Sequence, residues 1–326
     1  MARRKGVQLH DRLRADHRRR NLDMVTPSTS ASLFVGLGNM GRPMAINYSP
    51  GRELFVYDTN LAAAADVAMA TNGTALPNLE NIPPHIGTVI LMLPTSRIVE
   101  SVLRNDPGLF SQLAVGSLII DMSSSDPEST TDLAAEAAEL GIDFVDAPVS
   151  GGVSKADAGK LAIMAGGEST AVERAKSHLR NLGEDITHTG PAGTGHVAKA
   201  LNNLLSATNL AAAAEILTIA ATAGITPETM LEVINGSTGR SQATEFKYPR
   251  HILTGTFDSG FAMDLMVKDL RIARDLISRQ SAEAPVVLTA QQTAEKARDL
   301  LESASPDHTE FARYYEKLNG SSLRAS

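Results

Sequence analysis

Lys199 and Asn203 are the side chains whose types and spacing suit the transfer of a proton. They follow a glycine-rich run, 190–195, that predicts the start of a helix, and they lie one turn apart on one face of it. The helix dipole disfavours a cation near a helix start, so the pKa of a lysine there is lowered toward the range that favours general acid–base catalysis. A solvated surface lysine is the alternative reading of Lys199.

A second pattern, near the start of the chain, is typical of nucleotide binding. An apolar run, 33–35, predicts a buried strand, and a loop with the spacing G-x-G-x-x-G separates it from a helix start at Pro43. The first glycine allows a tight turn, the second lets backbone approach a pyrophosphate, and the third permits close helix–strand packing. The phosphates would then lie at the helix N-terminus. The loop consists of Gly36, Leu37, Gly38, Asn39, Met40 and Gly41.

Asp58 ends the next predicted strand, 53–57, near the spacing of roughly 20 residues that is typical of a ribose-binding acid. Its carboxylate would accept hydrogen bonds from both ribose hydroxyls and would repel a 2′-phosphate. The sequence therefore predicts NAD as the cofactor, with NADP disfavoured. A turn residue at a strand end is the alternative reading of Asp58.

A third pattern predicts a site for an anion. Residues 146–152 read Asp-Ala-Pro-Val-Ser-Gly-Gly and follow an apolar strand, 142–145. Ser150 followed by Gly151 and Gly152 exposes successive backbone N–H groups without side-chain cover, which makes a nest for a carboxylate. An ordinary glycine-rich loop is the alternative.

These residues need a scaffold, and strands alternating with helices predict one. Further strands are expected at 88–93 and 117–120, with a helix at 129–140. Such alternation implies a parallel sheet with helices on both faces, and ligands bind beyond the carboxyl ends of its strands. Two groups of residues follow strands at that edge and are predicted to contact the cofactor or to form ordinary turns. They are Leu93, Pro94 and Thr95 after one strand, and Ser123 and Ser124 after another.

The second half of the chain predicts helices only. Residues 194–223 form one long helical pattern that ends at Gly224, and Thr226 with Pro227 is typical of a fresh N-cap and first turn. Helices are expected to continue to about residue 318. Because the long helix is apolar nearly all round, it must be buried, and we expect a partner subunit, in a homodimer or homotetramer, to help bury it.

Composition excludes several classes of protein. The 326 residues exceed one typical core, and the net charge of −7 gives no basic surface for nucleic acid. Without cysteine there is no disulfide framework, and no spacing of His, Asp and Glu predicts a metal site. No uninterrupted apolar run is expected to reach the length of a membrane span.

The first thirty residues differ from the rest, because arginines crowd them and few apolar side chains are present. We expect a disordered basic extension, 1–30, in a cytoplasmic protein. A transit peptide for the mitochondrial matrix is the alternative, although Asp11, Asp16 and Asp23 disfavour it.

Together these patterns resemble the β-hydroxyacid dehydrogenase family, typified by 3-hydroxyisobutyrate dehydrogenase and tartronate semialdehyde reductase. The resemblance covers roughly residues 32–300. The segments that carry it, in the family's order, are 36–45, 92–96, 121–124, 146–152, 159–167, 199–203 and 268–270.

The resemblance implies an α/β fold, with an N-terminal Rossmann-type doubly wound sheet followed by an all-α C-terminal domain. The dinucleotide-binding domain would span 31–190. The helical substrate and oligomerisation domain would span 191–320 and contain the long interdomain helix at about 194–223.

The resemblance also implies roles. Lys199 would be the general acid–base, and Asn203 would hydrogen-bond the substrate hydroxyl or orient the lysine. Lys268 would lie beside Lys199, near substrate and cofactor, unless it only forms a surface ion pair with Asp269. His196 either tunes Lys199 or is an exposed histidine at a helix start. The residues implied to hold the substrate carboxylate are Ser123, Ser150, Gly151 and Gly152.

The implied activity is an NAD-dependent transfer of hydride between nicotinamide and a short hydroxy acid, such as 3-hydroxyisobutyrate, tartronate semialdehyde or glycerate, or threonate. An imine or NADPH-dependent reductase of the same fold and a non-catalytic cofactor-binding module are the alternatives. Gln242 stands where the family often has an aromatic residue, in a segment that the resemblance assigns to the substrate-side domain.

Overall fold

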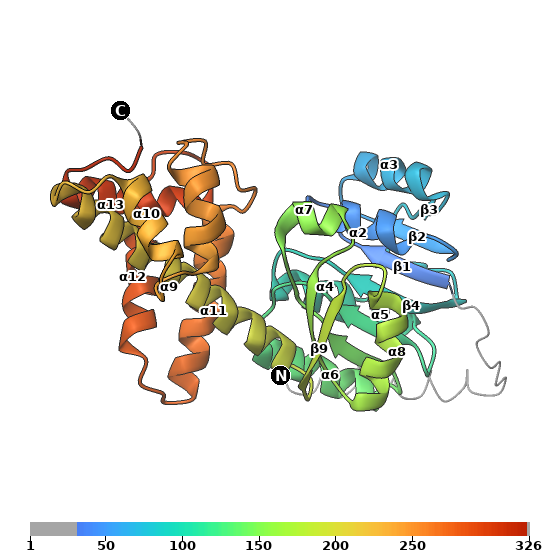
Figure 1. The fold of residues 1–326 in the computed structure, drawn as a ribbon. Helices are drawn as coiled ribbons and strands as arrows, with labels where there is room; N and C mark the ends of the chain where they lie inside the picture. The colour runs from blue at the N-terminus through green and yellow to red at the C-terminus, as the bar shows by residue number, and fades with distance from the viewer. Residues whose placement is uncertain (1–30, 325–326) are drawn as a thin grey trace. The chain divides into compact units, whose positions relative to one another are not determined.

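A computed structural model describes residues 31–324, which divide into two compact units with the boundary between Ala198 and Lys199 (Figure 1). The basic extension expected at 1–30 lies outside the described residues. Each unit is described in turn.

Unit 1 is built on a nine-stranded sheet. Six strands are parallel neighbours in the order β3-β2-β1-β4-β5-β6, so the strand order reverses between β1 and β4. Ligands of doubly wound sheets bind at such a reversal. The strands are β1 (Ala31–Val35), β2 (Leu54–Tyr57), β3 (Thr74–Ala75), β4 (Ile86–Leu91), β5 (Leu118–Asp121), β6 (Asp143–Asp146), β7 (Val149–Ser150), β8 (Ala162–Gly166) and β9 (Asp185–Gly190).

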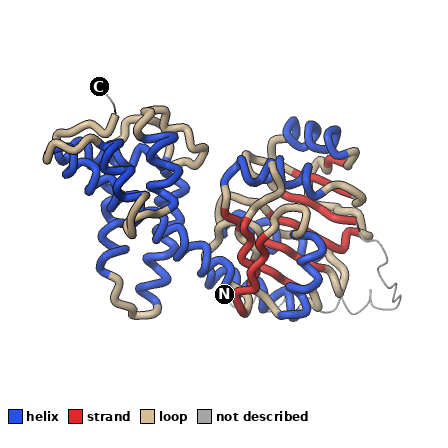
Figure 2. Tube along the Cα trace, viewed as in Figure 1, coloured by secondary structure: helices blue, strands red, loops and turns tan. Residues whose placement is uncertain are grey.

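Helices cover both faces of this sheet (Figure 2). Successive side chains of a strand point to opposite faces, so Leu33 and Val35 belong to one apolar core and Phe34 to the other. The helices of unit 1 are α2 (Gly41–Tyr48), α3 (Leu61–Thr71), α4 (Ser96–Arg104), α5 (Leu109–Gln112), α6 (Pro127–Glu139), α7 (Gly152–Asp157) and α8 (Ser169–Leu179).

The expected parallel sheet carries antiparallel pairs at one edge. β8 runs antiparallel to β6 and β7, and β9 then pairs with β8 in parallel. A parallel connection needs a crossover of a dozen or more residues. Between β7 and β8 the chain has only the six-residue helix α7 and a short loop, so it returns antiparallel.

The regular secondary structure in the described residues of unit 2 is helical, apart from one bridge between Ala262 and Asp307. Its buried core gathers side chains from every helix except the short η2, among them Leu210, Leu270 and Phe311. The elements are α9 (Thr194–Thr222), which begins in unit 1, α10 (Pro227–Asn235), a π-helix η1 (Ala243–Ile252), α11 (Met263–Arg279), α12 (Pro285–Leu300), a short 3-10 helix η2 (His308–Glu310) and α13 (Phe311–Asn319).

The predicted fold class, a Rossmann-type sheet followed by a helical region, is confirmed. The helix signals are also confirmed: α9 ends just before Gly224, and the Thr226 side chain caps α10 by accepting from Thr229 N.

α9 is long and apolar enough to cross a membrane by length and composition, although Glu215 interrupts its apolar run. This helix has 29 residues, and its most apolar window has a mean hydropathy of 1.5. Half of that window is buried within the protein, and central helices of helical domains pass the same test.

Candidate functional site

The surroundings of the loop between β1 and α2 give a reason for each of its three glycines. Gly36 has a φ of +96°, and a Cβ there would overlap the carbonyl oxygen of Met92. A Cβ on Gly41 would overlap the carbonyl oxygen of Gly36. A Cβ on Gly38, by contrast, would meet nothing within 4 Å. The protein itself therefore leaves room over Gly38, as a loop that brings backbone close to a pyrophosphate must.

Asp58 lies beside this loop at the end of β2. Its carboxylate accepts hydrogen bonds from Leu37 N and from Asn60 N, both at 2.7 Å. The α2 helix starts without a side-chain cap and without an acid in its first turn, so its N–H groups have no competing anion from the helix itself. These features fit a dinucleotide, with the phosphates over Gly38 and the ribose near Asp58.

A hydrogen bond joins the loop after β4 to the loop after β5. Leu93 N donates to Ser123 Oγ at 2.9 Å, and Ser123 is fully buried. The hydroxyl of Ser123 thus positions the loop after β4, and its predicted contact with the substrate carboxylate stays a prediction. Ser124 and Leu93 are half-buried, Pro94 is exposed, and the Thr95 hydroxyl caps α4 by accepting from Ile98 N at 3.4 Å.

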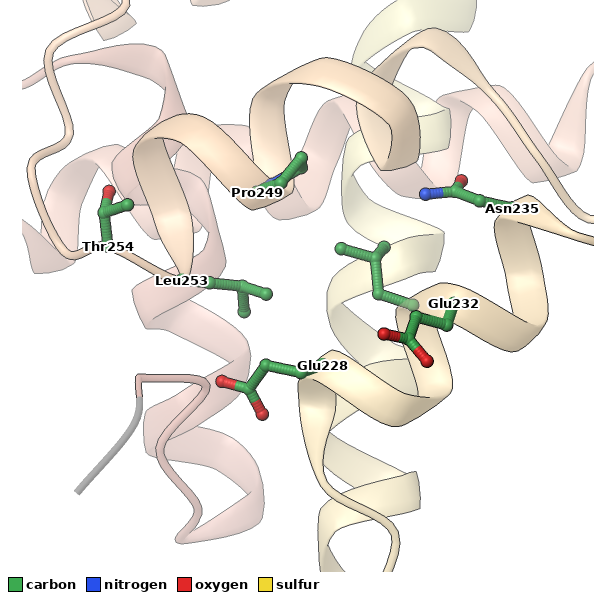
Figure 3. Close-up of a pocket in the computed structure, with 7 residues that line it drawn as sticks. Glu228, Glu232, Asn235, Pro249, Leu253 and Thr254 are labelled. Carbon is green, nitrogen blue, oxygen red and sulfur yellow. The ribbon is translucent and has the colours of Figure 1, made fainter.

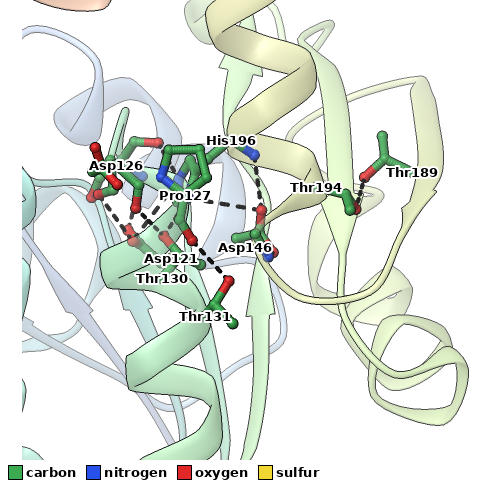
Figure 4. A network of polar contacts seen from close by, with 12 residues as sticks. Asp121, Asp126, Pro127, Thr130, Thr131, Asp146, Thr189, Thr194 and His196 are labelled. Carbon is green, nitrogen blue, oxygen red and sulfur yellow. Dashed lines mark hydrogen bonds and ion pairs between the residues drawn. The ribbon is translucent and has the colours of Figure 1, made fainter. Parts of the chain in front are cut away.

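A buried polar network fixes the start of α9 (Figure 4). The Asp146 carboxylate accepts from Gly193 N at 2.7 Å and from His196 N at 2.9 Å. The His196 ring lies 2.8 Å from Thr130 Oγ1, and its Nε2 donates to Ser123 O at 3.0 Å. Both expectations for His196 are therefore wrong: the residue is only 1% exposed, and its ring bonds to groups of unit 1 instead of tuning Lys199.

The turn predicted to bind an anion has two successive glycines with positive φ. Ser150 ends β7, Gly151 has a φ of +139° and Gly152 a φ of +68°. Both glycines are exposed, and a Cβ on Gly152 would meet nothing within 4 Å. Glycine tolerates these φ values, and the space over Gly152 leaves its backbone N–H without side-chain cover.

The structure brings Lys199, Asn203 and Lys268 together in unit 2 around a buried carboxylate. Asp269, only 4% exposed, accepts from Asn203 Nδ2 at 2.7 Å and lies 3.3 Å from Lys268 Nζ. Burial lowers the pKa of Lys199; Asp269 opposes this shift, and Lys268 adds to it. Lys268 therefore forms the expected ion pair with Asp269 and also acts on Lys199.

Sequence reasoning missed Lys247, on η1. Its Nζ donates to Ser206 Oγ at 3.0 Å, and burial lowers its pKa to about 8; Asp307 opposes this shift, and Lys199 adds to it. The helical spacing of Ser206, two turns after Lys199, was a signal in the sequence. Nothing local in the sequence connects Lys247 with that helix face. Gln242, immediately before η1, is exposed.

Unit 2 also contains a hollow of about 640 Å³ that includes none of these residues (Figure 3). It is lined by α10, by η1 and by the residues just after η1. The lining residues are Glu228, Leu231, Glu232, Asn235, Pro249, Leu253 and Thr254.

Comparison with known proteins identifies both parts of the chain. Residues 33–190 match the family model described as the NAD binding domain of 6-phosphogluconate dehydrogenase. Residues 193–315 match the one described as NAD-binding of NADP-dependent 3-hydroxyisobutyrate dehydrogenase.

Individual relatives cover most of the chain. The 2-(hydroxymethyl)glutarate dehydrogenase of Eubacterium barkeri is 39% identical over 89% of this chain and 96% of its own length. The 2-hydroxy-3-oxopropionate reductase of Escherichia coli is 34% identical over 79% of this chain and 88% of its own length. A solved structure of Mycobacterium tuberculosis 3-hydroxyisobutyrate dehydrogenase with L-serine has a TM-score of 0.80 and 30% identity, covering 89% of this chain and 99% of that one.

The glycine loop with Asp58, the lysine and asparagine on α9, and these relatives lead to one conclusion. The chain belongs to the β-hydroxyacid dehydrogenase family and is an NAD(P)-dependent oxidoreductase that acts on the CH–OH group of a hydroxy acid.

Proposed function

We propose that this enzyme uses NAD in preference to NADP and oxidises a short hydroxy acid, or reduces the matching aldehyde acid, with Lys199 as the general acid–base. The observation that carries the proposal is the site around Lys199, where burial lowers the pKa of an amine that shares its helix face with Asn203. Candidate substrates are 3-hydroxyisobutyrate, glycerate and threonate.

The bound nicotinamide supplies the hydride chemistry, and the protein moves the proton and holds the substrate. In oxidation the neutral amine of Lys199 accepts the hydroxyl proton, and in reduction its ammonium donates that proton. Asn203 orients the hydroxyl or the lysine, and Asp269 holds the Asn203 amide. Backbone N–H groups at Ser150, Gly151 and Gly152 receive the substrate carboxylate.

The preference for NAD rests on Asp58. Its carboxylate is ordered by Leu37 N and Asn60 N, so a 2′-phosphate brought to the end of β2 would meet a fixed negative charge. The remaining cofactor contacts of the proposal are the glycine loop, Leu93, Pro94, Thr95, Ser124 and Lys268.

Two further proposals accompany this function. Exposed apolar side chains on α9 support a homodimer or homotetramer; they are Leu201, Leu205, Ile216 and Ile219. A cytoplasmic location is proposed because the relatives reported above come from bacteria.

The test is a turnover assay on the purified full chain. NAD and NADP are each supplied with 3-hydroxyisobutyrate, glycerate, threonate, L-serine and 2-(hydroxymethyl)glutarate, and reduced nicotinamide is followed by absorbance. We expect the catalytic efficiency with NAD to exceed that with NADP by at least about tenfold, on the order of 1.4 kcal/mol.

The variant Asp58→Asn should lower the ratio of the catalytic efficiency with NAD to that with NADP. The control Glu53→Gln changes an exposed carboxylate just before β2 and should leave this ratio unchanged. Equal efficiencies with the two cofactors in the wild type would contradict the NAD assignment. Absence of turnover with every acid would contradict the proposed substrates.

A further inference from the structure

Lys247 carries a positive charge that the proposed hydride transfer does not require. It projects from η1, a π-helix of ten residues, whose turns are wider than those of an α-helix. Such segments are rare and are frequently found at functional sites. Lys247 Nζ reaches α9, where it donates to Ser206 Oγ at 3.0 Å.

Ser206 continues the face of α9 that carries the proposed proton-transfer group. Relative to Lys199, Asn203 is four residues on and Ser206 seven, so at about 100° per residue the three side chains fall within a sector of about 60°. Ser206 lies about 10 Å along the helix axis from Lys199 at 1.5 Å per residue. Lys247 therefore adds a second positive group to the same polar stripe.

The charge of Lys247 is not neutralised by an ion pair within residues 31–324. The carboxylate that acts on its pKa is Asp307, which already holds the loop before α11 and the start of η2. Asp307 accepts from Ser259 Oγ at 2.8 Å, from Gly260 N at 3.0 Å and from Thr309 N at 2.9 Å.

A purely structural role does not account for a lysine at this position. Linking η1 to α9 needs only a neutral hydrogen bond, whereas a partly buried ammonium carries a desolvation penalty. Lys199 nearby adds repulsion between like charges. An anion arriving from solution would relieve both effects.

We propose that Lys247 and Ser206 bind a second carboxylate of the substrate, so that among short hydroxy acids the enzyme prefers those that are dicarboxylates. This inference rests on the proposed function and names its substrate class. A single ammonium beside one hydroxyl matches a group of charge −1, whereas a phosphate monoester carries close to −2 at neutral pH.

The experiment compares 2-(hydroxymethyl)glutarate with its C5 amide, which has the same size and lacks the distal charge. We expect the wild type to prefer the diacid in kcat/KM by about 10- to 150-fold, the range for a hydrogen bond to a charged group. In Lys247→Met the ratio should fall close to one, and Lys247→Arg should restore most of it. Lys296→Met, which removes an exposed lysine of α12, should retain the wild-type ratio.

A second measurement needs no turnover. Thermal stabilisation of the wild type by glutarate should exceed that by glutarate monoamide, and Lys247→Met should abolish the difference. A wild-type kcat/KM ratio near one, or the same ratio in Lys247→Met as in the wild type, would overturn the inference.

The two proposals fail in distinguishable ways. If no hydroxy acid is turned over and the glutarate difference still depends on Lys247, the anion site stands and only the proposed function fails. If that difference is missing as well, both fail. If the enzyme turns over the diacid and its amide with equal efficiency, only the inference of a dicarboxylate substrate fails.

Discussion

At the residue scale, the protonation of Lys199 decides how the proposed reaction depends on pH. Burial lowers its pKa below the ordinary 10.5, with Lys268 adding to the effect and Asp269 opposing it. Oxidation requires the neutral amine, so its rate should rise as the pH increases through this lowered pKa. Reduction requires the ammonium, so its rate should fall over the same range. Rates of both directions against pH measure this, and parallel profiles would contradict the assignment.

Removing the amine gives a separate prediction. Lys199→Ala should lower kcat by about 10²- to 10⁴-fold, the usual contribution of general acid–base catalysis. Cofactor affinity, measured by titration with NADH, should change little. Lys296→Ala should keep wild-type turnover, since Lys296 is exposed on α12. Full activity of Lys199→Ala would exclude this lysine as the proton-transfer group.

Individual residues also show where sequence reasoning works. The contacts of Gly41 and Asp58 follow from local spacing, because their partners, Gly36 and Leu37, lie in the same β-α-β unit. The burial of His196 and the position of Lys247 depend on groups tens of residues away in sequence. No local pattern encodes those contacts.

At the scale of elements, the turn after β7 is predicted to set the affinity for the substrate carboxylate. Gly151→Val should raise KM for the acid and lower efficiency by roughly 10- to 150-fold, because a side chain at a φ of +139° distorts the nest. A Cβ there would also press against the Lys155 side chain.

A matched control separates binding from strain. Gly51→Val places a side chain at a φ of +75° in a surface turn where a Cβ meets nothing within 4 Å. It should lower the melting temperature without raising KM. Equal KM effects of the two variants would mean that backbone strain, not the anion nest, is being measured. The amide of the wild-type substrate's own carboxylate should also be a poor substrate.

The start of α9 gives a prediction about stability. Asp146→Ala would leave Gly193 N and His196 N without an acceptor in a fully buried place. We expect the free energy of unfolding to fall by about 2–4 kcal/mol, from the lost cap and the unsatisfied donors. Urea denaturation followed by circular dichroism measures it.

Asp126 is the comparison for this variant. It caps α6 by accepting from Glu128 N at 2.8 Å and is only half-buried. Asp126→Ala should therefore lower the free energy of unfolding by about 1 kcal/mol. A loss for Asp146→Ala no larger than this would show that burial of the α9 cap contributes little.

The bounds of helices were predicted best where the sequence contains capping residues or a terminating glycine. Thr226 with Pro227 starts α10, and Gly224 follows the end of α9, as expected. The antiparallel strand β8 was missed, because pairing direction depends on the connection and not on the strand's own residues.

At the scale of the whole molecule, the exposed side chains of α9 predict self-association. Light scattering coupled to size exclusion should give the mass of a dimer or a tetramer. The double variant Ile216→Glu with Ile219→Glu places charges on the exposed stripe of α9 and should shift the mass toward the monomer.

Met69→Glu is the control, since Met69 is 78% exposed on α3 of unit 1. It should leave the mass unchanged. A monomeric wild type would contradict the prediction, and an unchanged mass of the double variant would exclude the stripe as the interface.

The continuity of α9 constrains recombination between members of the family. Its cap, Asp146, belongs to unit 1, whereas Lys199 is the first residue of unit 2, and one uninterrupted helix carries the chain across the boundary. A chimaera that takes its sheet from one parent and its helices from another must be joined inside this helix without changing the residue count. Each inserted or deleted residue would turn everything that follows by about 100° about the helix axis. Crossovers that conserve the seven-residue interval from Gly193 to Ala200 should give active hybrids, whereas those that change it should give folded and inactive ones.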